Sequence, residues 1–475
     1  MTALDTPQAQ VWPVRVRGRS DRRALALGVL ALLSGLLGGD TVIHVVAVPR
    51  ASEYFAMGSG IAWLAAGMGA IALSACLLGA GTLGDRLGRR RILLGGTSAV
   101  VVGAFVATYA SDSTTFLIGR VITGAGLAAC FVTALAIVAA LYPPEDLPRA
   151  FGVWLGLQSV AIMAAGVVGS ALVDGTTWRT GYLITGVIAA LLLALGWLTV
   201  PDSKAATPRR FDGVGVLLGS AALAALVGGV YGAADRGWTD PLAASVLAAA
   251  VVLLVLFARR ELRTAEPAVP VRLLTSAPFA ATWSTGMLAG FAAAVVVLQT
   301  ITALHGHRGL SVSMVMVVAV PLYLGMVLGA DLAAQAQERG WSARTLYVSG
   351  LICCGVGILA LAGVGANAEL WVYSAVCAVA GFGVMWAQNP QSAVLMSSLP
   401  ADMSGVLAAV KTAAGQLGFV LGLAAAVSVV DTFRFTVGMV VIGTLLLAGA
   451  LVIAVLLRPW GFRTANTRDT GTAEA

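Results

Sequence analysis

An aspartate and a histidine lie one helical turn apart within an apolar stretch, GLLGGDTVIHVVAVPR (residues 35–50). Removing the Asp40 carboxylate from water near the middle of a bilayer costs about 2.5–3.5 kcal/mol on the insertion scale. Arg120 lies in another apolar stretch at a similar estimated depth, so an ion pair between them would offset part of that cost. A carboxylate whose pairing changes with conformation can bind and release a proton. We therefore predict proton coupling at Asp40 and Arg120.

His44 follows Asp40 by four residues and lies on the same helical face. An imidazole that water can reach titrates near neutral pH, so we predict that His44 is a proton relay. The alternative is structural: Asp40 and Arg120 hold two helices together, and His44 caps a polar pocket.

The elements that hold these residues are predicted from hydropathy. Of the 475 residues 59% are hydrophobic and 11% are charged, and the mean hydropathy is +0.92. Apolar stretches of about 20 residues, the length that crosses a hydrocarbon core, recur along the whole chain. We predict an all-α polytopic membrane protein with fourteen spans, near residues 24–48, 58–80, 92–110, 116–140, 151–173, 180–200, 212–233, 241–259, 278–301, 312–333, 344–365, 369–393, 404–429 and 436–457.

The basic residues are distributed unevenly across the predicted membrane. Of the 29 Lys and Arg, 22 lie on the side of the N-terminus, five lie in the opposite loops, and two, Arg120 and Lys411, lie within spans. Cytoplasmic loops carry an excess of Lys and Arg. The pattern predicts a multi-pass protein of the plasma membrane with both termini in the cytoplasm. Because topology accounts for the net charge of +7, we expect no nucleic-acid partner.

The longest polar stretches, PDSKAATPRRFDG and ARRELRTAEPAVPVRLL, flank the seventh and eighth spans. Two bundles joined by a helical pair suit a transporter built from repeats, with the substrate path between the halves. We predict a cytoplasmic tail (1–23), an N-terminal six-helix bundle (24–200), a linker region with two extra spans (201–276), a C-terminal six-helix bundle (277–458) and a second cytoplasmic tail (459–475).

A loop rich in glycine and arginine, GTLGDRLGRRR (residues 81–91), follows the second span. It resembles the signature loop of the major facilitator superfamily. Its glycines let helix ends approach closely, and its aspartate can face the positive N-terminal end of a neighbouring helix. Such contacts form in one conformation and break in another, so we predict a conformational latch at Gly81, Asp85, Arg86, Gly88 and Arg89. The alternative is an ordinary basic loop that obeys the positive-inside rule.

Other segments resemble one branch of that superfamily, the fourteen-span drug:proton antiporter family of multidrug efflux type. They are DTVIHVVAVP, GRVITGAGLAA, RRFDGVG, RGWTDP and SGVLAAVKTAAGQLGFVLG. The resemblance implies the major facilitator fold, with two six-helix bundles plus two extra linker helices, and export driven by protons. Three places depart from it. His44 replaces a usual asparagine, Ala165-Gly166 replaces a Gly-Pro pair, and Lys411 lies one turn before Gly415, where relatives commonly have an arginine.

Polar and aromatic side chains within the spans are candidates for binding a substrate. Flexible methionines, aromatic faces and neutral amides suit an adaptable pocket for bulky amphipathic compounds. For each tryptophan the alternative is a role in packing or as an interfacial anchor. The predicted substrate pocket comprises Trp63, Gln158, Trp283, Tyr323, Trp386, Gln388 and Asn389.

These features predict proton-coupled export of lipophilic or amphipathic compounds, monocationic ones among them, such as drugs, dyes or antibiotics. The alternatives are a dedicated exporter of one endogenous product (an antibiotic, a lipid or a siderophore) and a transport-inactive membrane sensor. The sequence has no GxxxxGK[ST] loop and no nucleophile–base constellation, so we expect neither ATP-driven pumping nor an enzyme. All five cysteines lie in apolar stretches, so we expect no disulfide, metal or cofactor. The expected partners are a small-molecule substrate, protons and the lipid bilayer, and we expect a monomer.

Overall fold

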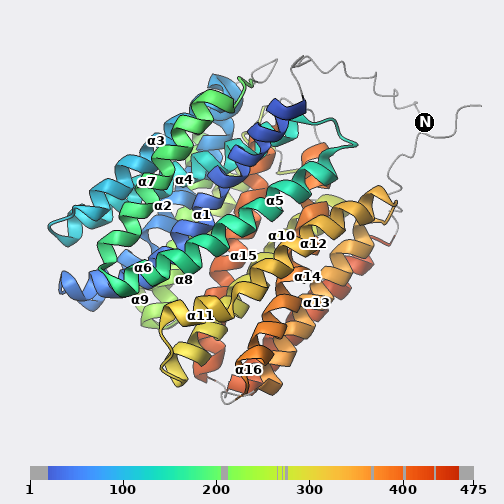
Figure 1. Ribbon diagram of the computed structural model, residues 1–475. Helices are drawn as coiled ribbons and strands as arrows, with labels where there is room; N and C mark the ends of the chain where they lie inside the picture. Colours follow the sequence, from blue (N-terminus) through green and yellow to red (C-terminus); the bar gives the residue numbers. More distant parts are fainter. Residues whose placement is uncertain are drawn as a thin grey trace, which may run out of the picture.

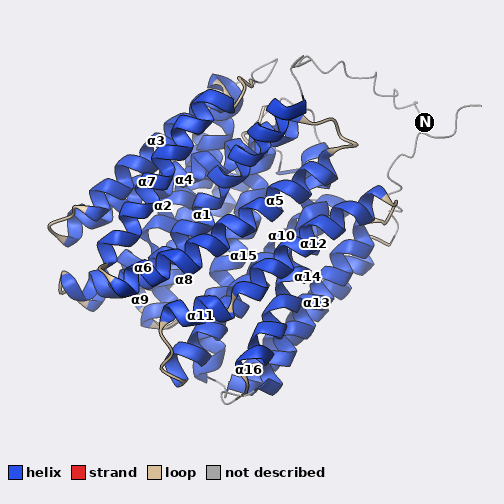
Figure 2. Ribbon diagram, in the orientation of Figure 1, coloured by secondary structure: helices blue, strands red, loops and turns tan. Residues whose placement is uncertain are grey.

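The structure, a computed structural model, describes residues 20–204, 212–264, 266–269, 271–272, 276–364, 368–398, 403–432 and 435–458. In these ranges the chain forms helices joined by short loops, without a strand (Figure 2). Fourteen helices of the described residues are long and apolar enough to cross a membrane, which confirms the predicted number of spans. Most of the two predicted tails lies outside the described residues.

The first six spans form one half of the molecule. Its first helix begins at Ser20 and continues past the predicted end at residue 48 to Tyr54, with Pro49 inside. The fifth span is made of three consecutive elements, because a π-helical turn interrupts it. The elements of this half are α1 (Ser20–Tyr54), α2 (Ser59–Leu87), α3 (Arg89–Thr108), α4 (Ser113–Leu141), α5 (Leu147–Ala164), η1 (Ala165–Gly169), α6 (Ser170–Gly175) and α7 (Trp178–Thr199).

The last six spans form the other half. Its second span is divided at Ala319, and the helix that follows carries Pro321 in its first turn. Proline lacks an amide donor and has a fixed φ, so it is tolerated where a helix begins. The elements are α10 (Ala277–Ile301), η3 (Thr302–His307), α11 (Val312–Val318), α12 (Val320–Glu338), α13 (Ala343–Val364), α14 (Leu370–Ser397), α15 (Ser404–Thr432) and α16 (Phe435–Leu456).

The extra helical pair, α8 (Gly213–Arg236) and α9 (Pro241–Arg263), lies beside both halves. The first of these helices packs on α2 and on α15, while α9 packs on α8. Only 11% of the apolar window of α9 is buried inside the protein, so most of this helix is left to face lipid.

Several helices begin directly after an aspartate whose side chain caps the first turn. Asp112 accepts a hydrogen bond from the Thr115 amide (2.9 Å) at the start of α4, and Asp240 accepts one from the Ala243 amide (2.9 Å) at the start of α9. A cap of this kind satisfies one of the amides that have no partner within the helix. The bond from the Thr115 amide holds the pKa of Asp112 below its usual value.

Asp212 caps α8 and also ties it to α9. Its carboxylate accepts a hydrogen bond from the Gly215 amide (3.0 Å) and binds the Arg260 guanidinium (2.9 Å). Burial alone would raise the pKa of Asp212, but these hydrogen bonds outweigh burial and hold the pKa below its usual value. Asp212 therefore stays ionised at neutral pH and joins the two extra helices.

The most extensive contacts between the two halves are those of α2 with α15 and of α5 with α12, and the second pair runs side by side in Figure 1. The side of the molecule at which α1 begins and α16 ends is called the terminal face below, and the other side is called the opposite face.

Candidate functional site

Asp40 and Arg120 form a bidentate ion pair between α1 and α4. Arg120 donates from Nη1 to Oδ1 (2.9 Å) and from Nη2 to Oδ2 (2.7 Å). Each side chain is 3% exposed, so the pair lies in a low-dielectric interior where each charge needs the other. The ion pair predicted from the estimated depths is present, and its role in proton coupling stays a prediction.

His44 is buried next to this pair, and both its ring nitrogens have partners. Nε2 lies 3.0 Å from the Ala65 carbonyl oxygen, and Nδ1 lies 2.7 Å from the Tyr182 hydroxyl. A carbonyl oxygen can only accept, so Nε2 carries the hydrogen. In the neutral imidazole Nδ1 then accepts from the hydroxyl. The pocket satisfies neutral His44 completely, and its role as a proton relay stays a prediction.

Tyr182, on α7, completes the polar cluster and was not predicted from the sequence. It is fully buried, and the Arg120 guanidinium carbon lies 5.3 Å from the centre of its ring. One residue therefore contacts the cation through its ring and the histidine through its hydroxyl. One feature of the sequence could have pointed to Tyr182: it is a tyrosine within an apolar span, and a buried hydroxyl requires a hydrogen-bond partner.

Tyr182→Phe is expected to destabilise the protein by about 1–3 kcal/mol, because it leaves Nδ1 of His44 buried without a donor. The measurement is the thermal unfolding midpoint of the detergent-solubilised protein. The control is Tyr109→Phe, since the Tyr109 side chain is 73% exposed. Equal midpoints for the two variants would show that the hydroxyl does not hold the histidine.

The Ala165-Gly166 departure coincides with the π-helical turn η1. The turn interrupts the fifth span at the place where the family resemblance predicts a Gly-Pro pair, so the helix is irregular here without a proline. It also packs on α1 next to the Asp40–Arg120 ion pair: a Cβ on Gly39 would lie 3.0 Å from the Cβ of Ala165. The irregular turn is thus adjacent to Asp40.

Asp85, in the predicted latch, contacts the other half of the molecule. Its carboxylate accepts hydrogen bonds from the amides of Gly405 (3.0 Å) and Val406 (3.2 Å), at the start of α15. Such amides have no partner within their own helix and form its positive end. Gly81 and Gly405 approach so closely that a Cβ on either would collide with the carbonyl oxygen of the other. Glycine at both positions lets the halves meet at the terminal face.

Among the other latch residues, Arg89 holds this carboxylate and the segment after α7. Arg89 is 2% exposed and donates to Asp85 from Nε (2.9 Å) and from Nη2 (2.7 Å). Its backbone amide also donates to the Ser203 carbonyl (2.8 Å). Gly88 separates α2 from α3 with a φ of +112°, a conformation that favours glycine. Arg86 is exposed.

A second contact joins the halves at the opposite face. Asp174 of α6 binds the Arg50 guanidinium (2.7 Å) and accepts a hydrogen bond from the Ser313 amide (3.2 Å) in the first turn of α11. As at Asp85, a carboxylate held by an arginine meets a helix start of the other half. The sequence analysis did not predict a role for Asp174, although its position as an acid at the end of an apolar span could have marked it as a candidate.

Two of the predicted substrate-pocket tryptophans pack against neighbouring helices. Trp63 faces α8, where the Arg236 guanidinium carbon lies 5.3 Å from the centre of its ring. Trp386 donates to the Ser349 hydroxyl of α13 (2.8 Å). These contacts agree with a packing role for both. Gln388 is half-buried on α14.

Asn389 lies where the halves meet. It donates to the Ala330 carbonyl (2.7 Å) and accepts from the Gln337 amide (3.1 Å), both on α12. Gly152 of α5 approaches it from the other half, since a Cβ there would lie 3.1 Å from the side-chain nitrogen of Asn389. Asn389 is therefore at the α5–α12 boundary, with its amide engaged.

Of the three further pocket residues, Gln158 and Tyr323 lie on the two helices of that boundary, whereas Trp283 lies on α10. Trp283 of α10 donates to the Val410 carbonyl of α15 (3.1 Å). Gln158 of α5 donates to the Ser34 carbonyl of α1 (3.4 Å). Tyr323 is buried on α12, the helix that packs on α5. The predicted pocket residues thus do not form one cluster.

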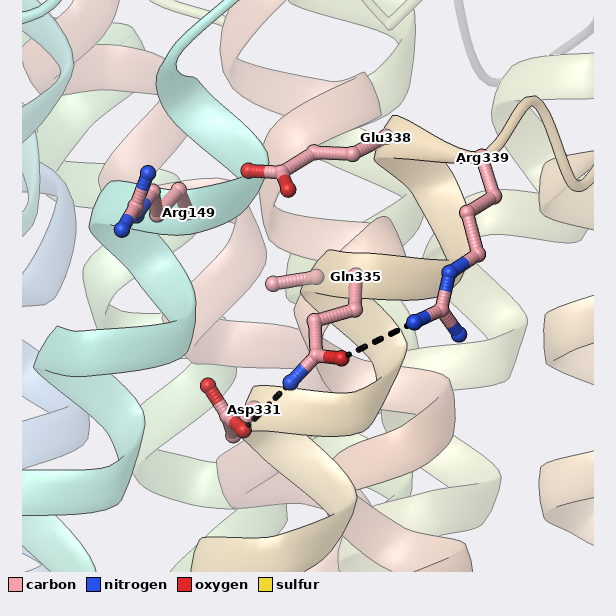
Figure 3. A pocket seen from close by; sticks show the side chains of 6 residues that line it. Arg149, Asp331, Gln335, Glu338 and Arg339 are labelled. Atoms are coloured by element: carbon pink, nitrogen blue, oxygen red, sulfur yellow. Dashed lines mark hydrogen bonds between the residues drawn. The ribbon is translucent and has the colours of Figure 1, made fainter.

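A polar cavity of about 390 Å³ lies between α5 and α12 near the terminal face (Figure 3). Within it the Gln335 amide donates to Asp331 (2.8 Å) and accepts from Arg339 (3.4 Å). Charges of both signs line a space that water can fill, and the sequence analysis did not predict this cavity. The lining residues are Arg149, Asp331, Ala334, Gln335, Glu338 and Arg339.

Comparisons with known proteins agree with this architecture. The family model described as Major Facilitator Superfamily matches residues 30–423. The chain is 29% identical over 413 residues to the multidrug efflux pump LfrA of Mycolicibacterium smegmatis, covering 86% of this chain and 81% of that protein. It is 27% identical over 411 residues to the tetracenomycin C resistance and export protein of Streptomyces glaucescens, covering 86% and 76%. The structure of the human organic anion transporter MFSD10 matches with a TM-score of 0.66 at 16% identity, covering 92% of this chain and 100% of that one, which is a likeness of fold.

Proposed function

The chain belongs to the Major Facilitator Superfamily, and from that membership we propose that it exports lipophilic or amphipathic compounds across the plasma membrane in exchange for protons. Two relatives are named for multidrug efflux and for export of one antibiotic. The observation that carries the proposal is the buried pair of Asp40 and Arg120. A buried carboxylate held by one arginine can exchange that partner for a proton when the conformation changes.

In this proposal the terminal face is cytoplasmic, because the segments there carry most of the Lys and Arg. The contact at Asp85 then closes the cytoplasmic side, and the contact at Asp174 closes the outer side. Alternating access opens them in turn around a substrate held between the halves. The polar cavity beside Arg149 lies on the cytoplasmic approach to that path.

Protons reach Asp40 when the path is open to the outside. Protonation neutralises the carboxylate and weakens its bond to Arg120, so α1 and α4 are held together less firmly. When the path faces the cytoplasm the proton leaves and the ion pair forms again. His44 and Tyr182 are the proposed relay, since their hydrogen bonds connect α1 to α7 beside the pair.

Proton coupling supplies enough free energy for export. One charge that moves through about 100 mV yields about 2.3 kcal/mol. At about 150 mV, one proton per substrate sustains a concentration gradient of roughly 300-fold.

The experiment that tests this function is ethidium efflux from proteoliposomes under an imposed pH gradient. We expect efflux that stops when nigericin collapses the gradient, with protein-free liposomes as the control. Equal efflux with and without the gradient would contradict proton coupling.

A second candidate is dedicated export of one endogenous product, which the name of the tetracenomycin C exporter favours. For a dedicated exporter we expect no efflux of ethidium, but we do expect a pH gradient to drive the flux of one particular compound. A transport-inactive sensor would bind a ligand without any flux.

A further inference from the structure

Lys411 places a buried cation between the two halves of the molecule. It lies on α15 and is 6% exposed. Its Nζ is 5.8 Å from the centre of the Phe131 ring of α4 and 5.8 Å from the centre of the Trp154 ring of α5. One half therefore supplies the ammonium, and the other half supplies the aromatic faces around it.

Lys411 differs from every other buried charge of the described residues. Seven charged side chains are buried there: Asp40, Asp85, Arg89, Arg120, Asp212, Glu261 and Lys411. The first six each take part in a hydrogen bond to a charged group or a backbone amide. Within the described ranges Lys411 has no hydrogen bond and no ion pair.

The aromatic rings do not replace the missing anion. Burying an unpaired ammonium costs several kcal/mol, whereas a cation–π contact returns about 0.5–2 kcal/mol. Trp154, whose ring faces the ammonium, carries a second unused donor, because its Nε1 is buried without an acceptor. Two contacting side chains, an ammonium and an indole, thus each have a donor without an acceptor, and an acidic group from outside the chain would supply one.

Lys411 lies close to the latch contact on α15. It follows the latch amides of Gly405 and Val406 by five to six residues, so it lies about 8–9 Å farther along α15. Opening of the contact at Asp85 therefore exposes Lys411 from the terminal face. Trp283, from the predicted pocket, binds the carbonyl of Val410, the residue before Lys411.

We propose that Lys411 and the indole N–H of Trp154 form a subsite for the acidic group of the exported compound, so that amphipathic organic anions with an aromatic body are among the substrates. The inference rests on the proposed export function and names a substrate class for it. A carboxylate or a phenolate meets the two donors, while the rings of Phe131 and Trp154 meet the aromatic body.

The test compares two dyes that share a xanthene ring system and differ in charge: anionic fluorescein and cationic rhodamine 123. Transport of each is measured in proteoliposomes under a pH gradient for wild type, Lys411→Met and Lys411→Arg. We expect Lys411→Met to raise the KM for fluorescein about tenfold or more, the effect of losing a charged hydrogen bond. Rhodamine 123 transport should stay within about twofold, and Lys411→Arg should retain most fluorescein transport because it keeps the cation.

Continued rhodamine 123 transport by Lys411→Met also shows that this variant folds. An equal loss of both dyes would overturn the proposal, because it would assign Lys411 to structure or to coupling. Unchanged fluorescein transport in Lys411→Met would overturn it as well, and so would wild type that carries rhodamine 123 but not fluorescein.

Fluorescein binding to the detergent-solubilised full chain, followed by fluorescence anisotropy, separates this inference from export itself. If wild type binds fluorescein, Lys411→Met does not, and neither dye is transported, then the subsite stands and the export function fails. If wild type does not bind fluorescein, the subsite is overturned whatever the transport result.

Discussion

Asp40→Asn is expected to abolish efflux driven by a pH gradient. Asparagine has the shape of aspartate and can accept one hydrogen bond from Arg120, but it cannot bind and release a proton. Gradient-driven ethidium efflux should therefore fall to the level of protein-free liposomes. Asp40→Glu keeps a titratable group and should retain part of the activity.

Arg120 is left without its counter-charge in Asp40→Asn, and breaking a buried ion pair costs about 3–5 kcal/mol. A second measurement therefore has to show that the variant folds: exchange of ethidium across the membrane at equal pH, which needs no coupling and should persist. The matched control is Asp240→Asn, because asparagine is as good a helix cap as aspartate. Gradient-driven efflux at the wild-type rate in Asp40→Asn would assign the pair a structural role.

Asp85→Asn is expected to loosen the contact between α2 and α15 at the terminal face. The charged carboxylate binds Arg89 and the amides of Gly405 and Val406, and a hydrogen bond to a charged group contributes about 1.5–3 kcal/mol. The amides at the start of α15 should then exchange hydrogen about 10- to 150-fold faster. Hydrogen exchange of a peptide that spans residues 403–410, followed by mass spectrometry, measures this directly.

The control for the latch is Asp202→Asn. Asp202 forms an exposed ion pair with Arg90 (3.4 Å), and exposed pairs contribute little. Exchange at the start of α15 should be unchanged in this variant. If Asp85→Asn also left the exchange unchanged, Asp85 would not hold the two halves together.

Two features could be predicted from the sequence, each for its own physical reason. One is the number of spans, and the other is that Asp85 faces the start of a helix. Each span is about as long as the membrane is thick, and fourteen such stretches are separated by polar turns. The latch depends on a short local pattern, in which glycines permit close approach and an aspartate faces a helix start. Depth within a span could also be counted along the chain, which was sufficient to pair Asp40 with Arg120.

The direction in which side chains point around each helix could not be read from the sequence in the same way. A span that is apolar on every side does not reveal whether a residue faces lipid, a neighbouring helix or the other half. Trp63 and Trp386 were predicted to line a substrate pocket, which stays a prediction, and the sequence did not reveal their contacts with Arg236 and Ser349. Tyr182 was missed because its partner, His44, is 138 residues away in the chain.

The hydropathy pattern of the sequence did not predict the irregular elements either. The π-helical turn at Ala165 contains no proline, and nothing in AAGVVG distinguishes it from regular helix. The contact between Asp174 and the Ser313 amide depends on where the two halves meet, which composition does not specify.

The central claim, proton-coupled export through Asp40 and Arg120, is tested most directly by reversing the coupling. Because coupling is reciprocal, a substrate gradient must move protons. Proteoliposomes that contain pyranine start at equal pH on both sides and then receive external ethidium, a permanent cation that carries no proton itself. For wild type we predict that the lumen becomes alkaline as ethidium enters, and that its pH stays constant in Asp40→Asn. Entry of ethidium into wild-type proteoliposomes without any change of pH would contradict the account.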